Sequence, residues 1–273
     1  MTEKTTADLT GVSETALLTL HSRAREAGRP DAIIEDPMAV QLLESIDYDF
    51  SRFGRTRQDF AIRALTFDRE TLTYLARHPK ATVVALAEGL QTSFWRVETA
   101  VTDPQFRWLT VDLEPIVELR RRLLPASDRV ELCAQSALDY RWMDGLDPGP
   151  GVFITAEGLL MYLEPDAALD LIRECASRFP GGAMMFDLPP SWFTALARSG
   201  WLKTSWRYTV PAMPFSMSPS EAATLVDIPG VRTARDVRHA PGRGSVTNAL
   251  LAATRLSPLL DPLRGVTVLL EFG

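Results

Sequence analysis

The chain after residue 79 consists of short, continuously apolar runs that alternate with segments of helical periodicity. Strands buried on both faces of a parallel sheet have this pattern, because helices cover both sides of such a sheet. The alternation therefore indicates an α/β fold. Seven runs are predicted to be strands, at residues 82–87, 106–111, 129–133, 151–155, 183–187, 231–236 and 266–271.

Apolar residues at helical spacing predict the other elements. Helices near 13–27, 38–45 and 57–78 precede the first strand and form an N-terminal helical extension over residues 1–78. The remainder, residues 79–273, is predicted to be the core, with helices near 92–101, 115–124, 166–179, 191–199, 220–226 and 246–253. A segment at 200–219, rich in aromatic residues, Met and Pro, interrupts the alternation. It is expected to be either a lid over a substrate pocket or a loop packed on the sheet.

Charge and cysteine content limit the classes of function. The 29 Lys and Arg against 35 Asp and Glu give a formal net charge of -6, and the basic residues are scattered among acids. Nucleic-acid binding requires a concentrated basic surface and is disfavoured. Cys133 and Cys175 lack the spacing of metal ligands, and no apolar run approaches the length of a membrane span. We expect a cytoplasmic protein that binds a small molecule, with no metal, nucleic acid or membrane partner and with an undetermined oligomeric state.

In a doubly wound sheet the ligand lies beyond the carboxyl ends of the strands, so the residues after each strand carry most of the functional information. The first strand leads into Ala87, Glu88 and Gly89, where the glycine lets the backbone turn close to a ligand. The second ends at Asp112 and Leu113, about twenty residues later, where a carboxylate is placed to accept both hydroxyls of a ribose. Alternatively, Asp112 caps the helix that begins near Pro115.

The third and fourth strands complete the predicted cofactor site. The segment Gln135-Ser136-Ala137-Leu138-Asp139 follows the third strand and is short and polar enough for a backbone or hydroxyl contact to an adenine edge. Ala156 and Glu157 end the fourth strand at the centre of the predicted cleft. The Glu157 carboxylate is suited to attract a sulfonium or ammonium charge, although a cap or structural acceptor is the alternative.

These segments resemble the leucine carboxyl methyltransferase family, and specifically its bacterial branch of polyketide carboxyl O-methyltransferases. The resemblance covers nearly the whole chain. It rests on Glu14-Thr15-Ala16-Leu17, Asp36-Pro37-Met38-Ala39, Ile62-Arg63 with Phe67-Asp68, and the stretches 83–96, 111–113 and 156–163.

The resemblance implies a seven-stranded, Rossmann-like methyltransferase sheet that binds S-adenosyl-L-methionine (SAM). It places Arg63 at the family's arginine for the SAM carboxylate, a role that suits the parallel donors of a guanidinium. Gly89, Asp112 and Glu157 fall on cofactor positions. The chain departs from the family's Gly-x-Gly loop and following Asp-Thr-Arg, because it has Ala87 and then Gln91-Thr92-Ser93. Ser136 stands where the family has an aspartate near the adenine.

Methyl transfer from a sulfonium is a direct displacement that chiefly requires alignment and exclusion of water. A carboxylate acceptor needs no base, whereas a phenol benefits from one. None of the three histidines lies in a recognisable catalytic pattern, which favours a carboxyl over a phenolic acceptor. Glu157 and Tyr162 are the predicted catalytic residues, and the base that a phenol would need is expected to be Tyr162 or an Asp. The predicted substrate-binding residues are Arg23, Trp206, Arg207 and Tyr208, with an arginine for a substrate carboxylate.

Two other classes of function are considered. A nicotinamide-dependent oxidoreductase is disfavoured, because the GxGxxG fingerprint and a Tyr-x-x-x-Lys pair are missing. A SAM-fold protein of natural-product biosynthesis that binds a ligand or catalyses a non-methylating reaction is the second alternative, suggested by the altered loop. The sequence favours a SAM-dependent O-methyltransferase acting on a polyketide-like small molecule.

Overall fold

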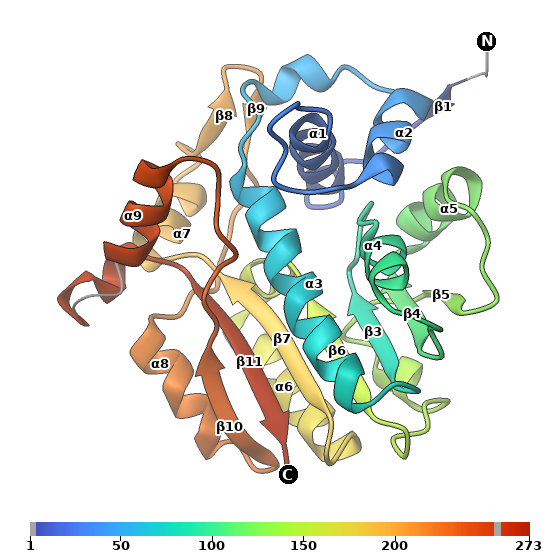
Figure 1. Cartoon of the computed structure of the whole chain (residues 1–273). Helices are drawn as coiled ribbons and strands as arrows, with labels where there is room; N and C mark the ends of the chain where they lie inside the picture. Colours follow the sequence, from blue (N-terminus) through green and yellow to red (C-terminus); the bar gives the residue numbers. More distant parts are fainter. Residues whose placement is uncertain (1–3, 254–257) are drawn as a thin grey trace.

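The seven predicted strands form one sheet, in the order β10-β11-β7-β6-β3-β4-β5 (Figure 1). The computed structural model describes residues 4–253 and 258–273. Each strand lies within two residues of its predicted bounds. The strands are β3 (Thr82–Leu86), β4 (Arg107–Asp112), β5 (Val130–Ala134), β6 (Val152–Ala156), β7 (Ala183–Leu188), β10 (Val231–Asp236) and β11 (Val266–Phe272).

Strand direction places the functional edge of the sheet. The strands β5, β4, β3, β6 and β7 run parallel, so their carboxyl ends meet at one edge. The strand β11 enters between β7 and β10 and is antiparallel to both. The prediction of a parallel sheet was wrong for this strand, because an apolar run records burial on both faces and not direction.

Helices cover both faces of the sheet, as its doubly buried strands require. On one face α3 (Asp59–Arg77) and α4 (Ser93–Ala100) pack against Val83 and Ala85 of β3. On the other, α5 (Glu114–Leu123) and α6 (Pro165–Arg178) contribute to the core that includes Val84 and Leu86. Figure 1 shows α3 crossing in front of the strands and α6 behind them. The period of two in β3 thus divides its side chains between two apolar layers.

The N-terminal residues form a cap above the carboxyl ends of the parallel strands. Figure 1 shows α1 (Thr15–Ala27) and α2 (Pro37–Ser45) there, beyond the upper end of β3. Around them lie short elements: the paired strands β1 (Thr5–Thr6) and β2 (Ile46–Asp47), and the 3-10 helix η1 (Phe50–Phe53). The three helices predicted before the first strand of the sheet are therefore confirmed. The division of the chain into a separate N-terminal unit and a core stays a prediction.

The segment 200–219 contains a small hairpin of β8 (Lys203–Ser205) and β9 (Tyr208–Thr209). It lies against η1, where the Ser205 hydroxyl donates to the Arg52 carbonyl. The other elements after β7 are α7 (Ser191–Arg198), α8 (Pro219–Ala223), η4 (Thr224–Asp227), α9 (Ser245–Ala253) and η5 (Pro258–Leu263). The 3-10 helices η2 (Tyr140–Met143) and η3 (Leu160–Tyr162) flank β6.

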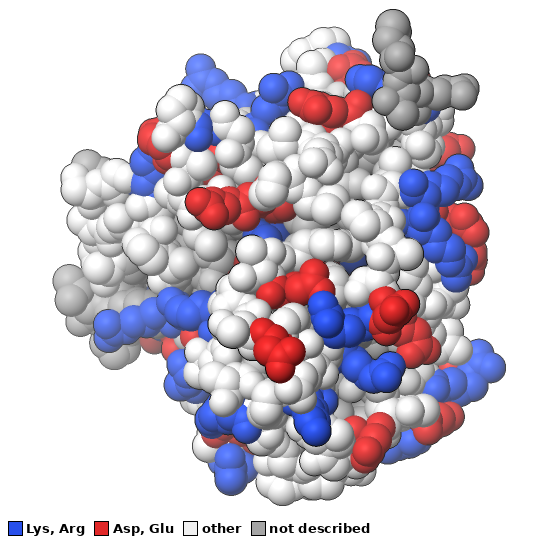
Figure 2. Space-filling model, turned by 45° about the vertical axis from the view of Figure 1, so that its right-hand side comes forward, with Lys and Arg blue, Asp and Glu red and all other residues white. Residues whose placement is uncertain are grey.

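The surface carries charges of both signs. On the face in Figure 2, basic and acidic side chains are interspersed, with no continuous basic surface among its described residues. None of the described helices is both long and apolar enough to cross a bilayer.

Candidate active site

A cavity of about 790 Å³ opens at the carboxyl ends of the parallel strands. Its walls come from the loops after β3 to β7, from α1 and α3, and from the segment before α3. Most of the predicted site residues line it: Arg63, Ala87, Glu88, Gly89, Asp112, Leu113, Ser136, Ala137, Leu138, Glu157 and Tyr162. The rule of reading the residues after each strand therefore brought together side chains that are far apart in the sequence.

The turn that follows β3 has an unusual backbone. Both Ala87 (φ 49°) and Gly89 (φ 60°) lie in the left-handed region. Gly89 adopts this conformation without strain, whereas Ala87 carries a Cβ there at an energetic cost. A Cβ on Gly89 would lie 3.1 Å from the Cβ of Ala16 in α1. The glycine is thus required both by its backbone angle and by the close approach of α1.

Two buried arginines hold the carbonyl groups of this turn. Arg120 donates from Nη1 to the carbonyls of Gly89 and Gln91, each at 2.9 Å. Arg23 donates from Nη2 to the Leu90 carbonyl at 2.8 Å. Three consecutive carbonyls are therefore fixed by side chains, which defines the path of the backbone beside the cavity.

Glu88 belongs to the support of the turn. Its Oε2 lies 2.9 Å from Nη2 of Arg120 and accepts a hydrogen bond from the Thr110 hydroxyl. The residue is only 8% exposed, and burial raises the pKa of its carboxyl group. The Glu88 carboxylate is bound inside the protein by Arg120 and Thr110. If Glu88 contacts a cofactor as predicted, the contact is therefore made by its backbone.

Asp112 presents a carboxylate with unused acceptor capacity. Its Oδ2 accepts from the Gly89 amide and its Oδ1 from the Leu113 amide, both at 2.7 Å. The helix α5 begins after Leu113 without a side-chain cap, so Asp112 does not serve as that cap. Burial raises the pKa of Asp112, while the two amides act in the opposite direction. Each oxygen keeps one lone pair, enough to receive a vicinal diol.

Apolar side chains stand beside Asp112. Leu113 and Leu138 line the cavity and remain 49% and 38% exposed. The Ser136 hydroxyl accepts from the Leu138 amide at 3.2 Å and so shapes the loop after β5. The arrangement offers apolar walls of the kind that a flat heterocycle requires.

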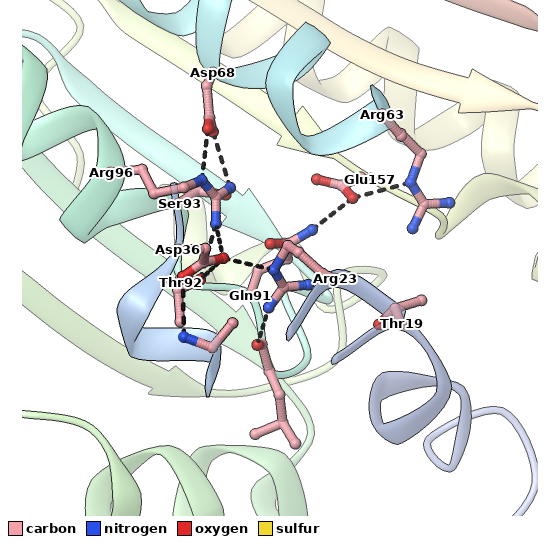
Figure 3. Close-up of polar contacts among 12 residues, drawn as sticks. Thr19, Arg23, Asp36, Arg63, Asp68, Gln91, Thr92, Ser93, Arg96 and Glu157 are labelled. Atoms are coloured by element: carbon pink, nitrogen blue, oxygen red, sulfur yellow. Dashed lines mark hydrogen bonds and ion pairs between the residues drawn. The ribbon is translucent and has the colours of Figure 1, made fainter. Parts of the chain in front are cut away.

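A charged cluster also lines the cavity. Arg63 donates from Nε to Glu157 at 2.9 Å and from Nη1 to Asp187 at 3.3 Å. Figure 3 shows Glu157 between Arg63 and Gln91, whose Nε2 donates to the same oxygen at 2.6 Å. One guanidinium and two carboxylates, when ionised, give the cluster a net charge of -1. It is therefore suited to attract a cation from the cavity.

The glycine after Glu157 makes room for this cluster. Gly158 has φ 71°, and a Cβ there would lie 3.1 Å from Nη1 and 3.2 Å from Nη2 of Arg63. Its amide donates to Asp187 at 2.7 Å. The guanidinium can lie across the backbone only because position 158 has no side chain.

Burial sets the protonation behaviour of the cluster. It raises the pKa of Asp187, partly offset by Arg63. Burial would lower the pKa of Arg63, but the two carboxylates raise it. Burial also raises the pKa of Tyr162 to about 12. The Tyr162 hydroxyl is therefore protonated at neutral pH, the form in which a phenol is able to donate a hydrogen bond.

Sequence reasoning missed Asp187 and Gln91. Asp187 lies near the end of β7, so the residues at the end of the fifth strand held the same kind of signal that identified Asp112 and Glu157. Gln91 gave no such signal, since its role depends on an amide reaching Glu157 across the cavity.

Five predicted site residues lie outside the cavity lining: Ala156, the three hairpin residues and Arg23. Ala156 is fully buried in the core of the sheet. Trp206 is 88% exposed, Arg207 pairs with Asp49 at 2.6 Å, and Tyr208 packs on Phe53 in the aromatic cluster near η1. The three hairpin residues therefore lie apart from the cavity in which the other predicted site residues meet. The segment instead contributes Thr204, Val210 and Met213 to the cavity.

Arg23 also requires correction. It is 0% exposed, and its Nε donates to Asp36 at 2.8 Å. Figure 3 shows Asp36 between Arg23 and Arg96, with Thr92 donating to the same carboxylate. Arg23 therefore holds α1 to α2 and to the turn after β3, and it cannot reach a substrate.

Comparisons with known proteins identify the family. The sequence profile described as leucine carboxyl methyltransferase matches residues 16–176. The chain is also 32% identical over 252 residues to the tetracenomycin polyketide synthesis O-methyltransferase TcmP of Streptomyces glaucescens, covering 88% of this chain and 92% of TcmP. The chain belongs to the leucine carboxyl methyltransferase family. It is a SAM-dependent methyltransferase.

A fungal relative extends the family relationship. The SAM-dependent methyltransferase dpfgK of Gibberella zeae is 30% identical over 210 residues, covering 69% of this chain and 70% of its own length. The chain is thus similar to a second SAM-dependent methyltransferase over 69% of its length.

Solved structures share the fold at low identity. A protein from Thermobifida fusca superposes with a TM-score of 0.58 at 13% identity, covering 96% of this chain and 94% of its own. The CurJ carbon methyltransferase superposes with a TM-score of 0.51 at 11% identity, covering 95% and 67%. The predicted seven-stranded methyltransferase fold is confirmed.

Proposed function

We propose that this enzyme transfers the methyl group of SAM to an oxygen of a polyketide-like small molecule, either a carboxyl or a phenolic hydroxyl group. The observation that carries the proposal is the Asp112 carboxylate, which keeps two acceptor positions at the edge of the cavity beside the turn after β3. The relationship to TcmP, whose name assigns it to tetracenomycin polyketide synthesis, supports the oxygen acceptor and the class of substrate.

Asp112 would receive the two ribose hydroxyls of SAM. Leu113, Ala137 and Leu138 would enclose the adenine, with Ser136 shaping the same loop. The backbone at Ala87 to Gly89 would pass beside the methionine part. These assignments use the apolar walls, the unfilled lone pairs and the left-handed turn described above.

The charged cluster would hold the amino acid end of SAM. Glu157 and Asp187 give it the negative charge that an ammonium or sulfonium requires. Nη2 of Arg63 has no acceptor among the described residues and is left to bind the SAM carboxylate. The Arg63 guanidinium would then bind three carboxylates, those of Glu157, Asp187 and SAM.

When bound, SAM supplies an electrophilic methyl group, and the chain supplies orientation and a dry cavity. The apolar lining excludes water, which would otherwise solvate the attacking oxygen. A carboxylate acceptor attacks without losing a proton. Because Tyr162 is protonated at neutral pH, the site offers that residue only as a hydrogen-bond donor. This favours a carboxyl acceptor over a phenol.

Calorimetry with S-adenosylhomocysteine (SAH) tests the cofactor site. The Asp112→Asn variant loses half of the acceptor character facing the ribose, so we expect its affinity for SAH to fall by about tenfold or more. Asp139→Asn is the matched control, since Asp139 follows the neighbouring strand but pairs with Arg141 on the surface. Equal affinities of wild type and Asp112→Asn would refute the ribose assignment.

A labelled-methyl assay over aromatic polyketide acids and phenols tests the acceptor. We expect label to be transferred to the acids as base-labile esters. Transfer to phenols alone would refute the carboxyl preference while leaving the enzyme an O-methyltransferase. Binding of SAH without transfer to either class of acceptor would contradict the proposed activity.

A further inference from the structure

A second, more open cavity of about 570 Å³ adjoins the first, with which it shares one lining residue. Its walls come from α1, from η1 and from the segment that joins η1 to α3. Arg55 lines both cavities. The Arg55 side chain is therefore available to a ligand in either cavity.

The walls of the second cavity are cationic. Arg25 and Arg55 both line it and are exposed, and no acidic residue is among the described residues of the lining. Neither arginine forms an ion pair with the part of the chain that the structure describes. In contrast, Arg57 at the same mouth pairs with Asp59 at 2.7 Å, and Arg63 is held by Glu157 and Asp187.

His21 adds a buried polar atom. It lies one helical turn before Arg25 on α1, so the two side chains share a face of the helix. The residue is 6% exposed, its ring centroid lies 5.4 Å from that of Phe50 with the two planes tilted by 31°, and Nδ1 has no hydrogen-bond partner within the described residues. Buried polar atoms are normally satisfied, so an unsatisfied nitrogen in a cavity lining is a feature that a bound ligand would complete.

The mouth of the active site also offers apolar surface. Trp192 and Leu263 line the larger cavity while remaining 51% and 58% exposed. An aromatic side chain in this position can stack on a ring that enters the cavity. A ligand that satisfies both features combines an aromatic body with an acidic group.

Building on the proposed function, we infer that Arg25 and Arg55 form an anion subsite for an acidic group of the substrate other than the oxygen that is methylated. The ring system would lie against the apolar mouth, with the acceptor oxygen inside the active site. The fork of Arg55 is suited to a carboxylate, which it can bind through parallel donors. The substrate class is therefore an aromatic acid that carries a second acidic group.

The test measures binding of two probes to the protein saturated with SAH. Naphthalene-2-carboxylate has one acid and naphthalene-2,6-dicarboxylate has two. We expect the diacid to bind about tenfold more tightly, which is the usual gain from one charge-assisted hydrogen bond. Arg55→Gln and Arg25→Gln should each reduce or remove this gain without changing the affinity for the monoacid or for SAH. Arg57→Gln, which alters a paired arginine at the same mouth, should preserve it.

Three outcomes would overturn the subsite. They are equal affinity of the two probes, an Arg57→Gln effect as large as that of Arg55→Gln, and failure of both probes to bind although SAH binds. The gain should also shrink at high salt, because both arginines are exposed to screening. Failure of SAH itself to bind would instead refute the proposed function, so the two failures are distinguishable.

Discussion

Ala87 shows how one residue can adopt a backbone conformation that usually belongs to glycine. Its φ of 49° places it in the left-handed region, two residues before the first of the carbonyls that Arg23 and Arg120 hold. The resemblance to the family predicted a departure at this position but not its form. The structure shows that Ala87 adopts a left-handed conformation in spite of its Cβ, at a cost in backbone strain.

Ala87→Gly should stabilise the protein. Release of left-handed strain of about 1–2 kcal/mol is opposed by the greater freedom of glycine in the unfolded chain, about 0.5–1 kcal/mol. We expect the free energy of unfolding in urea to rise by about 0.5–1 kcal/mol. Ala85→Gly is the control, since Ala85 lies in the extended interior of β3 and should lose stability. A loss of stability in both variants would show that Ala87 is not strained.

Site residues could be predicted from the sequence where they lie at the end of a recognisable strand. Asp112 and Glu157 were found because each follows a buried strand in the sequence. Arg63 lies on a helix, where it carries no such mark, and only the family resemblance indicated it. Arg23 was assigned to the substrate because sequence does not show that its guanidinium is buried against Asp36.

At the scale of elements, a buried ion network joins the N-terminal helices to the sheet. Asp36, at the start of α2, accepts from Arg23 of α1 and from Arg96 of α4. Arg96 also binds Asp68 of α3 through two nitrogen atoms. Four helices therefore meet at two carboxylates, and the network supports the turn after β3 through Arg23 and Thr92 (Figure 3).

Asp36→Asn should destabilise the protein strongly. It would leave two buried guanidinium groups without their shared charge, a change that typically costs about 3–5 kcal/mol. Urea unfolding at neutral pH would measure the loss. Asp31→Asn is the control, because Asp31 pairs with Arg29 on the surface and should contribute about 0–1 kcal/mol. A loss no larger than that of the control would contradict the role of the network.

The stability difference between wild type and Asp36→Asn should depend on pH. Burial would raise the pKa of Asp36, but Arg96 and Arg23 lower it below its ordinary value of about 3.9. A lowered folded pKa adds stability above the unfolded pKa, and this stability is lost as the pH falls through the folded value. The difference in the free energy of unfolding between wild type and Asp36→Asn should therefore become smaller at acidic pH.

The pattern of elements was more predictable than their pairing. The strands and helices were identified because each carries its own period of apolar residues. The antiparallel insertion of β11 was not, since strand order and direction depend on contacts between distant segments. The position of the β8–β9 hairpin against η1 was unpredictable for the same reason.

At the scale of the whole molecule, the N-terminal cap and the segment after α7 enclose one cavity together. Gly54 marks their junction. Its φ is 75°, and a Cβ there would lie 2.8 Å from the Thr204 carbonyl and 3.1 Å from the Cβ of Ser205. Arg207 and Asp49 pair across the same junction. The cavity wall contributed by Thr204 therefore depends on a glycine more than one hundred residues earlier in the sequence.

Gly54→Ala tests this dependence against Gly11→Ala. Both glycines have positive φ, so each alanine should cost about 1–2 kcal/mol of backbone strain. Nothing lies within 4 Å of a Cβ on Gly11, whereas the one on Gly54 meets backbone. We expect Gly54→Ala to lose at least about 1 kcal/mol more in urea unfolding, the typical added cost of overpacking. Because the hairpin must shift to relieve the contact, KM for the acceptor should rise in Gly54→Ala and stay unchanged in Gly11→Ala. Equal stability losses and equal KM values would show that the hairpin does not depend on the N-terminal cap for its position over the cavity.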